Sequence, residues 1–202
     1  LEYESFNAAA AKIHIKGESI HPGTAKNKMV HAGQLAMELN AMLPVGQRPE
    51  LTEGYEGFFM MTDIHGGVAE ADLSYIIRDH NKEKFDAKKE LMRDIVDFMV
   101  KKHGDRFTLT IEDSYYNMAD IIKDHMELVD AAAKAMEDLG IEPLIQPIRG
   151  GTDGSQLSYM GLPCPNIFTG STNHHGAYEL AVVSWMDKAV EVIVKIVESF
   201  AK

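Results

Sequence analysis

The sequence predicts a mixed α/β protein in two parts, and two observations carry this prediction. Over about residues 6 to 116, strand-like and helix-like periodicities alternate in the order β-α-β-β-α-β, which is typical of a ferredoxin-like, split βαβ arrangement. Beyond residue 116, three helix-like segments alternate with two short apolar runs, which predicts an α/β layer with a parallel sheet. Two strands are few for a parallel sheet, so this second part is expected to be incomplete.

The elements of the first part follow from apolar spacing and from glycine or proline stops. Within residues 9–17, apolar and polar residues alternate weakly from Ile13 to Lys16 and predict a strand that ends at Gly17. Apolar residues at steps of three and four from Ala25 to Leu43 predict a helix, which Pro44 stops. Two strand-like runs around a Gly66-Gly67 turn follow. A helix over 82–104 and a strand over 106–117 complete the part, and the apolar face of that helix is expected to carry Leu91, Ile95, Phe98 and Lys102.

In the second part, the spacing of apolar residues predicts helices over 127–140, within 149–161 and over 184–202. Short apolar runs predict strands over 143–148 and 163–170. Ser184 and Asp187 are spaced as the capping box that would start the last helix. The expected apolar stripe of this helix consists of Met186, Ala189, Val190, Ile193, Val197 and Phe200.

Composition narrows the class of protein and its expected location. The formal net charge of −11 argues against a nucleic-acid or anionic-membrane partner. The single cysteine excludes an internal disulfide and fits a reducing compartment. No run approaches the roughly 18 apolar residues that a membrane helix needs, and the first residues lack the pattern of a signal peptide. The expected location is therefore the cytoplasm.

The stretch GSTNHHGAYE, residues 170–179, holds the first candidate site. Glycines allow a loop to approach a ligand closely, and neutral imidazole is the commonest side-chain metal ligand. His175 is therefore a candidate metal ligand, with Glu179 four residues further on, and His174 is expected to be its neighbour. An ordinary surface loop explains the same residues.

Four other residues are candidates for contact with a substrate, each with a plainer alternative. His21 precedes Pro22 at a predicted helix entrance, where it can donate to a substrate oxygen or simply form a turn. Arg78 ends an apolar run and can bind a carboxylate or pair with Asp79. Asn117 can be an amide donor or a turn former. Arg149 precedes two glycines in a turn that favours an anion or only joins a strand to a helix.

Several longer blocks resemble one enzyme family over essentially the whole chain. The blocks are YESFNAA, IHPGTAK, LTEGYEGF, YIIRD, IEDSYYNM, PIRGGTDGSQLSYMGLPCPN and the NHHG loop. In all of these blocks the chain resembles the tripeptide aminopeptidases of the dizinc exopeptidase family, which also includes acylases and desuccinylases. Motifs of other chemistries, such as GxSxG, CxxC, HExxH and GxGxxG, are absent.

The resemblance implies a catalytic domain with two zinc ions and a smaller lid inserted into it. Residues 6–116 would be the ferredoxin-like lid and dimerisation domain, and residues 1–5 and 117–202 the C-terminal part of the α/β zinc-exopeptidase catalytic domain. His175 would be the last of five metal ligands. The other four, and a catalytic glutamate, would precede Leu1, so this chain alone is expected to be inactive.

The resemblance also implies roles for the substrate-binding candidates. His21 would stabilise the tetrahedral oxyanion, from the other subunit in dimeric relatives, and Arg78, Asn117 and Arg149 would hold the tripeptide. A homodimer through the lid is expected, with no nucleic-acid or membrane partner. Two alternatives stay open: an N-acyl amino acid amidohydrolase of the same family, and a non-catalytic dimerisation or binding module.

Overall fold

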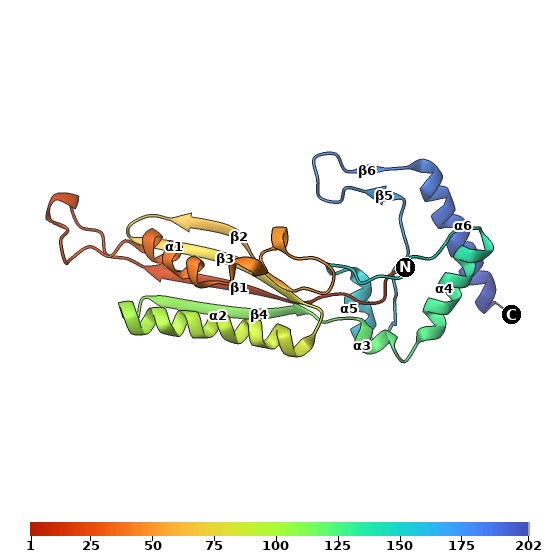
Figure 1. Cartoon of the computed structure of the whole chain (residues 1–202), viewed down its shortest axis with the longest axis horizontal. Coiled ribbons are helices and arrows are strands. Elements are labelled where there is room, and N and C mark those ends of the chain that lie inside the picture. The colour runs from red at the N-terminus through yellow and green to blue at the C-terminus, as the bar shows by residue number, and fades with distance from the viewer. Residues whose placement is uncertain (202) are drawn as a thin grey trace. The chain divides into compact units, whose positions relative to one another are not determined.

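The structure, a computed structural model, describes residues 1–201 and divides into two compact units. We call Phe6–Tyr116 the sheet unit, and Leu1–Ser5 with the chain from Asn117 onward the terminal unit. Each unit is described by itself (Figure 1).

The sheet unit contains one four-stranded antiparallel sheet with strand order β2-β3-β1-β4. The predicted order β-α-β-β-α-β and the ferredoxin-like fold are thus confirmed. The elements are β1 (Asn7–Lys16), α1 (Ala32–Met42), β2 (Phe58–Gly66), β3 (Glu70–Asp79), α2 (Lys82–His103) and β4 (Phe107–Tyr115).

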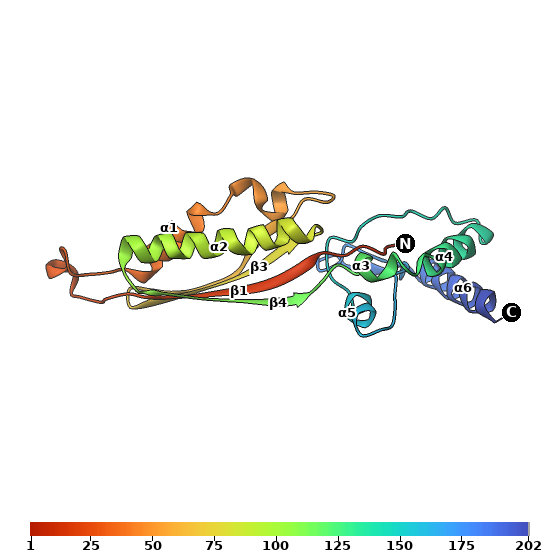
Figure 2. The same ribbon diagram turned by 90° about the horizontal axis from the view of Figure 1, so that it is seen from below.

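Buried and more exposed residues alternate along the two central strands, β1 and β3, and the buried ones form the core of this unit. Every second residue of β1 and β3 is buried, and Ile13 pairs with Leu73 on one side and with Leu109 on the other. Helices α1 and α2 contact each other and lie on the same face of the sheet (Figure 2). The buried residues that they cover on β1 and β3 are Ala9, Ala11, Ile13, Ile15, Ala71, Leu73, Tyr75 and Ile77. Burial of this one face fixes the register, because a slip by one residue would expose all of them.

The predicted start of the first helix was wrong. Helix α1 begins at Ala32, and only Pro22–Thr24 are helical before it, as a single 3-10 turn. Asn27 has a φ of 63°, which ends any right-handed helix there, and Val30 pairs with Glu18 instead. The spacing of Ala25 and the residues after it therefore mimicked a helix where the chain forms a closed loop.

The predicted buried face of the second long helix was also partly wrong. Asn81 caps α2 by accepting a hydrogen bond from the Lys84 amide at 2.9 Å. The face that follows from this start buries Phe85, Lys89, Met92, Ile95, Val96 and Met99. Phe98 is 48% exposed and belongs to the outer face, so only Ile95 of the expected set is fully buried.

The terminal unit is largely helical. Its helices are α3 (Ala119–Ile122), α4 (Met126–Asp138), α5 (Asp153–Tyr159) and α6 (Val183–Phe200), and its only described strands form the short hairpin of β5 (Ser171–Thr172) and β6 (Leu180–Ala181). The predicted strands over 143–148 and 163–170, and the parallel sheet, are therefore wrong for residues 1–201.

Extended chain replaces the two expected strands. The Ile148 amide donates to the Glu4 carbonyl at 2.9 Å, and Glu2 forms an antiparallel bridge with Asn166. Each apolar run thus lies beside residues 1–4, but the few bonds to this short segment do not make a regular ladder.

Helix α6 differs from its prediction at its start and along its face. Val182 is the N-cap and makes no side-chain cap, so the predicted Ser184–Asp187 capping box is wrong. Only Ala189 and Val192 are buried, whereas Val190, Val197 and most of the expected stripe are exposed. The apolar stripe is left uncovered by residues 1–201. No helix among these residues combines the length and the apolar character required to cross a membrane.

Candidate functional site

His21 lies in a loop that projects beyond one end of the sheet (Figure 1). Backbone hydrogen bonds between Glu18 and Val30, at 2.7 and 3.0 Å, close the base of this loop. A Cβ atom on Gly17 would lie 2.0 Å from the Val68 carbonyl oxygen, so only glycine permits the close approach of the loop to the β2–β3 turn. The loop is therefore anchored at its base and exposed at its tip.

The imidazole of His21 is oriented by its own turn. Its Nδ1 atom accepts a hydrogen bond from the Gly23 amide at 3.1 Å, and Pro22 occupies the first position of the 3-10 turn. Because Nδ1 is the acceptor, the neutral ring carries its proton on Nε2. The turn thus leaves an exposed Nε2–H donor, so the turn role and the donor role of His21 are compatible.

Arg78 lies on the sheet face opposite the helices, beside Tyr115. Its guanidinium donates to the Tyr115 hydroxyl and lies 4.8 Å from the centre of the same ring. Burial lowers the pKa of Arg78 and raises the pKa of Tyr115. The alternative that Arg78 pairs with Asp79 is not observed, because the Asp79 carboxylate pairs with Lys88 at 2.9 Å.

His21 and Arg78 lie far apart along the strands of the sheet. The His21 loop adjoins the β2–β3 turn, where the Ala32 amide donates to the Val68 carbonyl. Arg78 is near the other end of β3, beside the start of β1 at Ala8. Ten residues of β3 span roughly 30 Å. In one copy of the chain, these two side chains lie at opposite ends of the same sheet.

Asn117 is buried and joins segments within the terminal unit. Its Oδ1 atom accepts hydrogen bonds from the backbone amides of Ser5 at 2.9 Å and Ala119 at 3.0 Å. The Tyr159 hydroxyl donates to its backbone carbonyl at 3.0 Å. These bonds position the residues where the chain passes between units, while the substrate role of Asn117 stays a prediction.

Arg149 is half-buried at the end of the extended segment, in the bend before α5. The glycine-rich sequence that follows Arg149 allows α5 to pack closely against the segment around Cys164. A Cβ atom on Gly154 would lie 2.5 Å from the Cys164 carbonyl oxygen, and the Ser158 hydroxyl accepts from the Cys164 amide at 3.0 Å. The Ser155 hydroxyl donates to that of Ser5 at 2.9 Å. Sequence reasoning missed this buried serine network, whose one local sign is the spacing of small residues along α5.

His175 lies in the loop between β5 and β6 with a φ of 63°, which is rare for a residue other than glycine. Glu179 holds this loop, because its carboxylate accepts from the His175 amide at 3.1 Å and lies 3.5 Å from His174 Nδ1. The His175 imidazole is exposed and has no hydrogen-bond partner within residues 1–201. Glu179 therefore positions the backbone and leaves the His175 ring available, which is the arrangement expected of a ligand held by its surroundings.

A complete metal site is not formed by the described residues. No group of three or more histidine, cysteine, aspartate or glutamate side chains within residues 1–201 is arranged to hold an ion. His103, at the end of α2, pairs through its imidazole with Glu38 at 3.1 Å. The described chain fits a metal only as the source of one ligand, His175.

The family follows from comparison with known sequences. A family model described as the peptidase dimerisation domain of the M20 peptidases matches residues 3–104, half of the chain. The chain belongs to the M20 peptidase family. The match spans the sheet unit up to the end of α2.

Individual relatives extend this similarity over the whole chain. Peptidase T of Alkaliphilus oremlandii is 56% identical over 203 residues, which cover 100% of this chain and 50% of that protein. Peptidase T of Bacillus subtilis is 57% identical over 201 residues, which cover 99% of this chain and 49% of that protein. The chain thus spans about half the length of these curated M20 relatives.

Solved structures agree with the fold. An aminopeptidase from Bacillus cereus has a TM-score of 0.81 at 24% identity, covering 100% of this chain and 54% of that one. A tripeptidase from Staphylococcus aureus has a TM-score of 0.83 at 21% identity, covering 96% and 52%. A Bacillus subtilis protein described as a dinuclear metal-binding M20 peptidase has a TM-score of 0.60 at 18% identity, covering 95% and 49%.

Proposed function

We propose that this chain is part of a metal-dependent aminopeptidase that releases the N-terminal residue of tripeptides in the cytoplasm. The observation that carries the proposal is the identity of 56 and 57%, over essentially the whole chain, with two proteins named peptidase T. The Staphylococcus structure that shares the fold is titled a tripeptidase, which agrees with this substrate class.

His21 is the proposed oxyanion donor. Its Nε2–H is free because Nδ1 already accepts from Gly23, and a donor aimed at a developing oxyanion stabilises the transition state. Since His21 and Arg78 lie at opposite ends of one sheet, a single reaction centre that uses both takes them from two copies of the chain. This geometry supports a homodimer in which His21 acts on the partner's site.

The sheet unit offers a surface for such a dimer. Strand β2 is an edge strand of the sheet, and Met60, Met61 and Ile64 on it are exposed. An edge with exposed apolar side chains is a natural site for pairing with another chain. The match to a dimerisation domain supports the same assignment.

Arg78, Arg149 and Asn117 are the proposed substrate-binding residues. An arginine guanidinium can bind a carboxylate through two parallel hydrogen bonds. Arg78 is positioned for this by the ring and hydroxyl of Tyr115. Asn117 is held in place by the hydrogen bonds that its Oδ1 atom accepts from two backbone amides.

His175 is the proposed ligand of a two-zinc site whose other ligands come from outside residues 1–201. Bound in pairs, such ions polarise a carbonyl and make hydroxide available at neutral pH. Within this chain, Glu179 would hold the loop so that the His175 ring faces the ion. The chain of 202 residues by itself is expected to be inactive and to bind no stoichiometric pair of zinc ions.

Two preparations test the proposal, the 202-residue chain and a longer protein that contains it. The longer protein should cleave Gly-Gly-Gly and ignore N-acetyl amino acids, and its activity should be lost with a chelator and regained with zinc. Cleavage of N-acetyl amino acids instead would identify an amidohydrolase. Dimerisation with no cleavage of either substrate would identify a non-catalytic module, and chelator-sensitive turnover by the 202-residue chain would contradict the assigned ligand set.

A further inference from the structure

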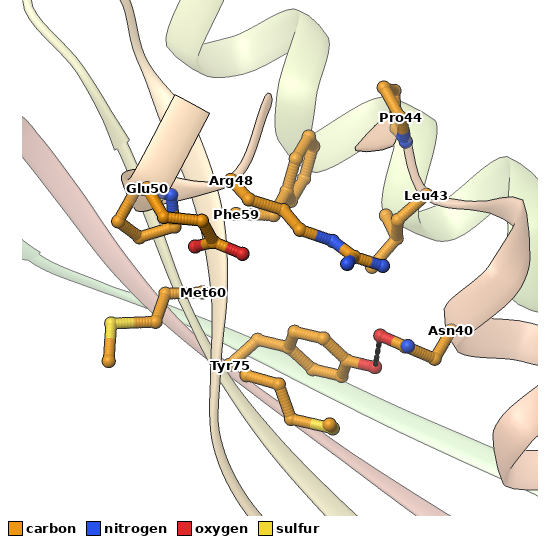
Figure 3. A pocket seen from close by; sticks show the side chains of 10 residues that line it. Asn40, Leu43, Pro44, Arg48, Glu50, Phe59, Met60 and Tyr75 are labelled. Atoms are coloured by element: carbon orange, nitrogen blue, oxygen red, sulfur yellow. Dashed lines mark hydrogen bonds between the residues drawn. The ribbon is translucent and has the colours of Figure 1, made fainter. Parts of the chain in front are cut away.

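A pocket of about 410 Å³ lies within the sheet unit, beside the end of α1 (Figure 3). Its walls come from the end of α1 and the residues that follow it, from the 3-10 turn Pro49–Leu51, and from strands β2 and β3. Its volume is in the range of small-molecule sites, which is about 300–1,000 Å³. None of the residues proposed for catalysis, substrate binding or metal binding lines it, while Met60 and Met61 also belong to the β2 edge proposed for dimerisation. The lining residues are Asn40, Leu43, Pro44, Arg48, Pro49, Glu50, Phe59, Met60, Met61 and Tyr75.

Two opposite charges line this pocket without neutralising each other. Within residues 1–201, the Arg48 guanidinium has no acidic partner and the Glu50 carboxylate has no basic one. Figure 3 shows the Arg48 guanidinium on the side of Leu43 and Asn40, and the Glu50 carboxylate on the side of Met60. Pro49 lies between the two residues and has a fixed φ, which limits their rearrangement.

A third polar group adds a donor beside Arg48. The Tyr75 hydroxyl donates to Asn40 Oδ1 at 3.1 Å, which fixes the orientation of the amide. The Asn40 NH2 group therefore stays available to a ligand on the same side as the guanidinium (Figure 3). Burial raises the pKa of Tyr75 to about 12, so its hydroxyl remains protonated and keeps this bond at neutral pH.

The rest of the lining is apolar and adaptable. Leu43 and Phe59 are buried at its wall, while Met60 and Met61 are 41% and 36% exposed. Methionine side chains are flexible and polarisable, and they adapt to apolar groups of different shape. An apolar side chain of a ligand would therefore find a matching surface between the two charged residues.

We propose that this pocket binds a free apolar α-amino acid, with its carboxylate on Arg48 and Asn40, its ammonium on Glu50, and its side chain against Phe59 and Met61. A simple anion would meet the Glu50 carboxylate and the chain's net charge of −11, both of which repel it. A simple cation would meet the Arg48 guanidinium. A zwitterion satisfies both groups, and charge-assisted hydrogen bonds are the stronger kind.

The test uses the 202-residue chain with 13C-labelled methionine methyl groups, titrated with L-methionine, N-acetyl-methionine and methioninamide. L-methionine should shift the Met60 and Met61 methyl signals saturably at millimolar concentration or below. Met37 is exposed but does not line the pocket, so its signal should stay in place. Each analogue lacks one charge and should bind at least about tenfold more weakly.

Matched variants locate the binding. Arg48→Gln should weaken L-methionine at least about tenfold and Glu50→Gln should do the same, with Arg93→Gln and Glu90→Gln on exposed α2 positions as controls without effect. Unchanged methyl signals of the other methionines show that the variants remain folded, and Arg48→Lys provides a milder change if Arg48→Gln does not. The proposal is overturned by the absence of a shift at about 10 mM ligand or by equal binding of all three probes.

Discussion

The Arg78 guanidinium lies 4.8 Å from the centre of the Tyr115 ring and donates to the hydroxyl of the same residue. Arg78 on β3 and Tyr115 on β4 pair with Ala8 of β1, the strand that lies between them. The small alanine leaves the space in which the two long side chains meet. One ring thus sets both the position and the orientation of the guanidinium.

This relationship predicts different effects of two substitutions in the longer enzyme. Arg78→Lys keeps the charge but loses the planar fork and the stacking, and should raise KM for a tripeptide about 10- to 100-fold. Tyr115→Phe keeps the ring and loses one acceptor, so its effect on KM should be several-fold smaller. Steady-state kinetics measure both, with Arg93→Lys on α2 as a control. If Arg78→Lys leaves KM unchanged, Arg78 does not bind the substrate.

His21→Ala in the longer enzyme should act mainly on kcat. Loss of one oxyanion donor costs about 10²–10³ in kcat, whereas a group that contacts only the transition state has little effect on KM. Zinc content should stay the same, because the imidazole makes only the turn bond to Gly23. His14→Ala, which removes a sheet histidine paired with Asp72, is the control.

Mixing experiments decide whether His21 acts on the partner subunit. Dimers formed from one His21→Ala subunit and one His175→Ala subunit contain a single site with both histidines intact if His21 acts across the interface. Such mixtures should regain activity that neither parent has. Failure of every mixture, with mixed dimers present by mass, would mean that both histidines come from the same copy.

Two adjacent histidines should differ sharply in metal binding. His175→Ala in the longer enzyme should lower bound zinc and reduce activity by orders of magnitude, because its ring is the available imidazole. His174→Ala should matter far less, since its Nδ1 faces Glu179 at 3.5 Å. Glu179→Gln should lie between them, because it weakens the bond that holds the His175 amide. Elemental analysis gives the zinc content, and equal losses in the two histidine variants would refute the assignment to His175.

Local periodicity predicted the sheet unit well because only one face of its sheet is covered by helices. Buried and more exposed residues therefore alternate along β1 and β3, and the glycines near residue 66 mark the turn between β2 and β3. These local signals were enough to predict the order of the elements and the topology of the sheet. The start of α1 failed for a physical reason. The positive φ at Asn27 and the Glu18–Val30 bridge are interactions of the closed loop, which the apolar spacing from Ala25 does not encode.

The sequence predicted which residues belong to the candidate site better than it predicted which side chains contact one another. His21, Arg78 and His175 were found from motifs, and Tyr115 was missed because its partner lies across the sheet from it. The role of Gly154 was hidden for the same reason, since Cys164 is ten residues further along the chain. Partners distant in sequence leave no local pattern, and the expected strands of the terminal unit lacked the neighbours that make a ladder.

The pH dependence of stability should reveal the buried Tyr75 hydroxyl. Burial raises its pKa from 10.0 to about 12, so folding favours the neutral form. Its contribution is fully present below pH 10 and is lost as the pH rises toward 12, with an amplitude on the order of 2 kcal/mol. Urea unfolding at increasing alkaline pH should therefore show a steeper loss for the native chain than for Tyr75→Phe. Tyr178→Phe, at an exposed position, should follow the native chain. Parallel curves for the native chain and Tyr75→Phe would mean that Tyr75 ionises alike in both states.

Gly154→Ala should loosen the packing of α5 in the terminal unit. The new Cβ atom would lie 2.5 Å from the Cys164 carbonyl oxygen and 2.9 Å from Asn166 Oδ1, and the first of these is backbone that cannot rotate away. Overpacking of this kind costs about 1–3 kcal/mol. The single cysteine, Cys164, reports the change directly, because Ser158 Oγ holds its amide in the folded state.

Local opening governs how fast a half-buried thiol reacts, so labelling of Cys164 by a disulfide reagent should accelerate about 5- to 150-fold in the Gly154→Ala variant. Gly150→Ala is the control, since its nearest neighbour would be 4.0 Å away, and its labelling rate should match the native chain. Equal rates for both variants would show that α5 moves aside without loosening the Cys164 segment.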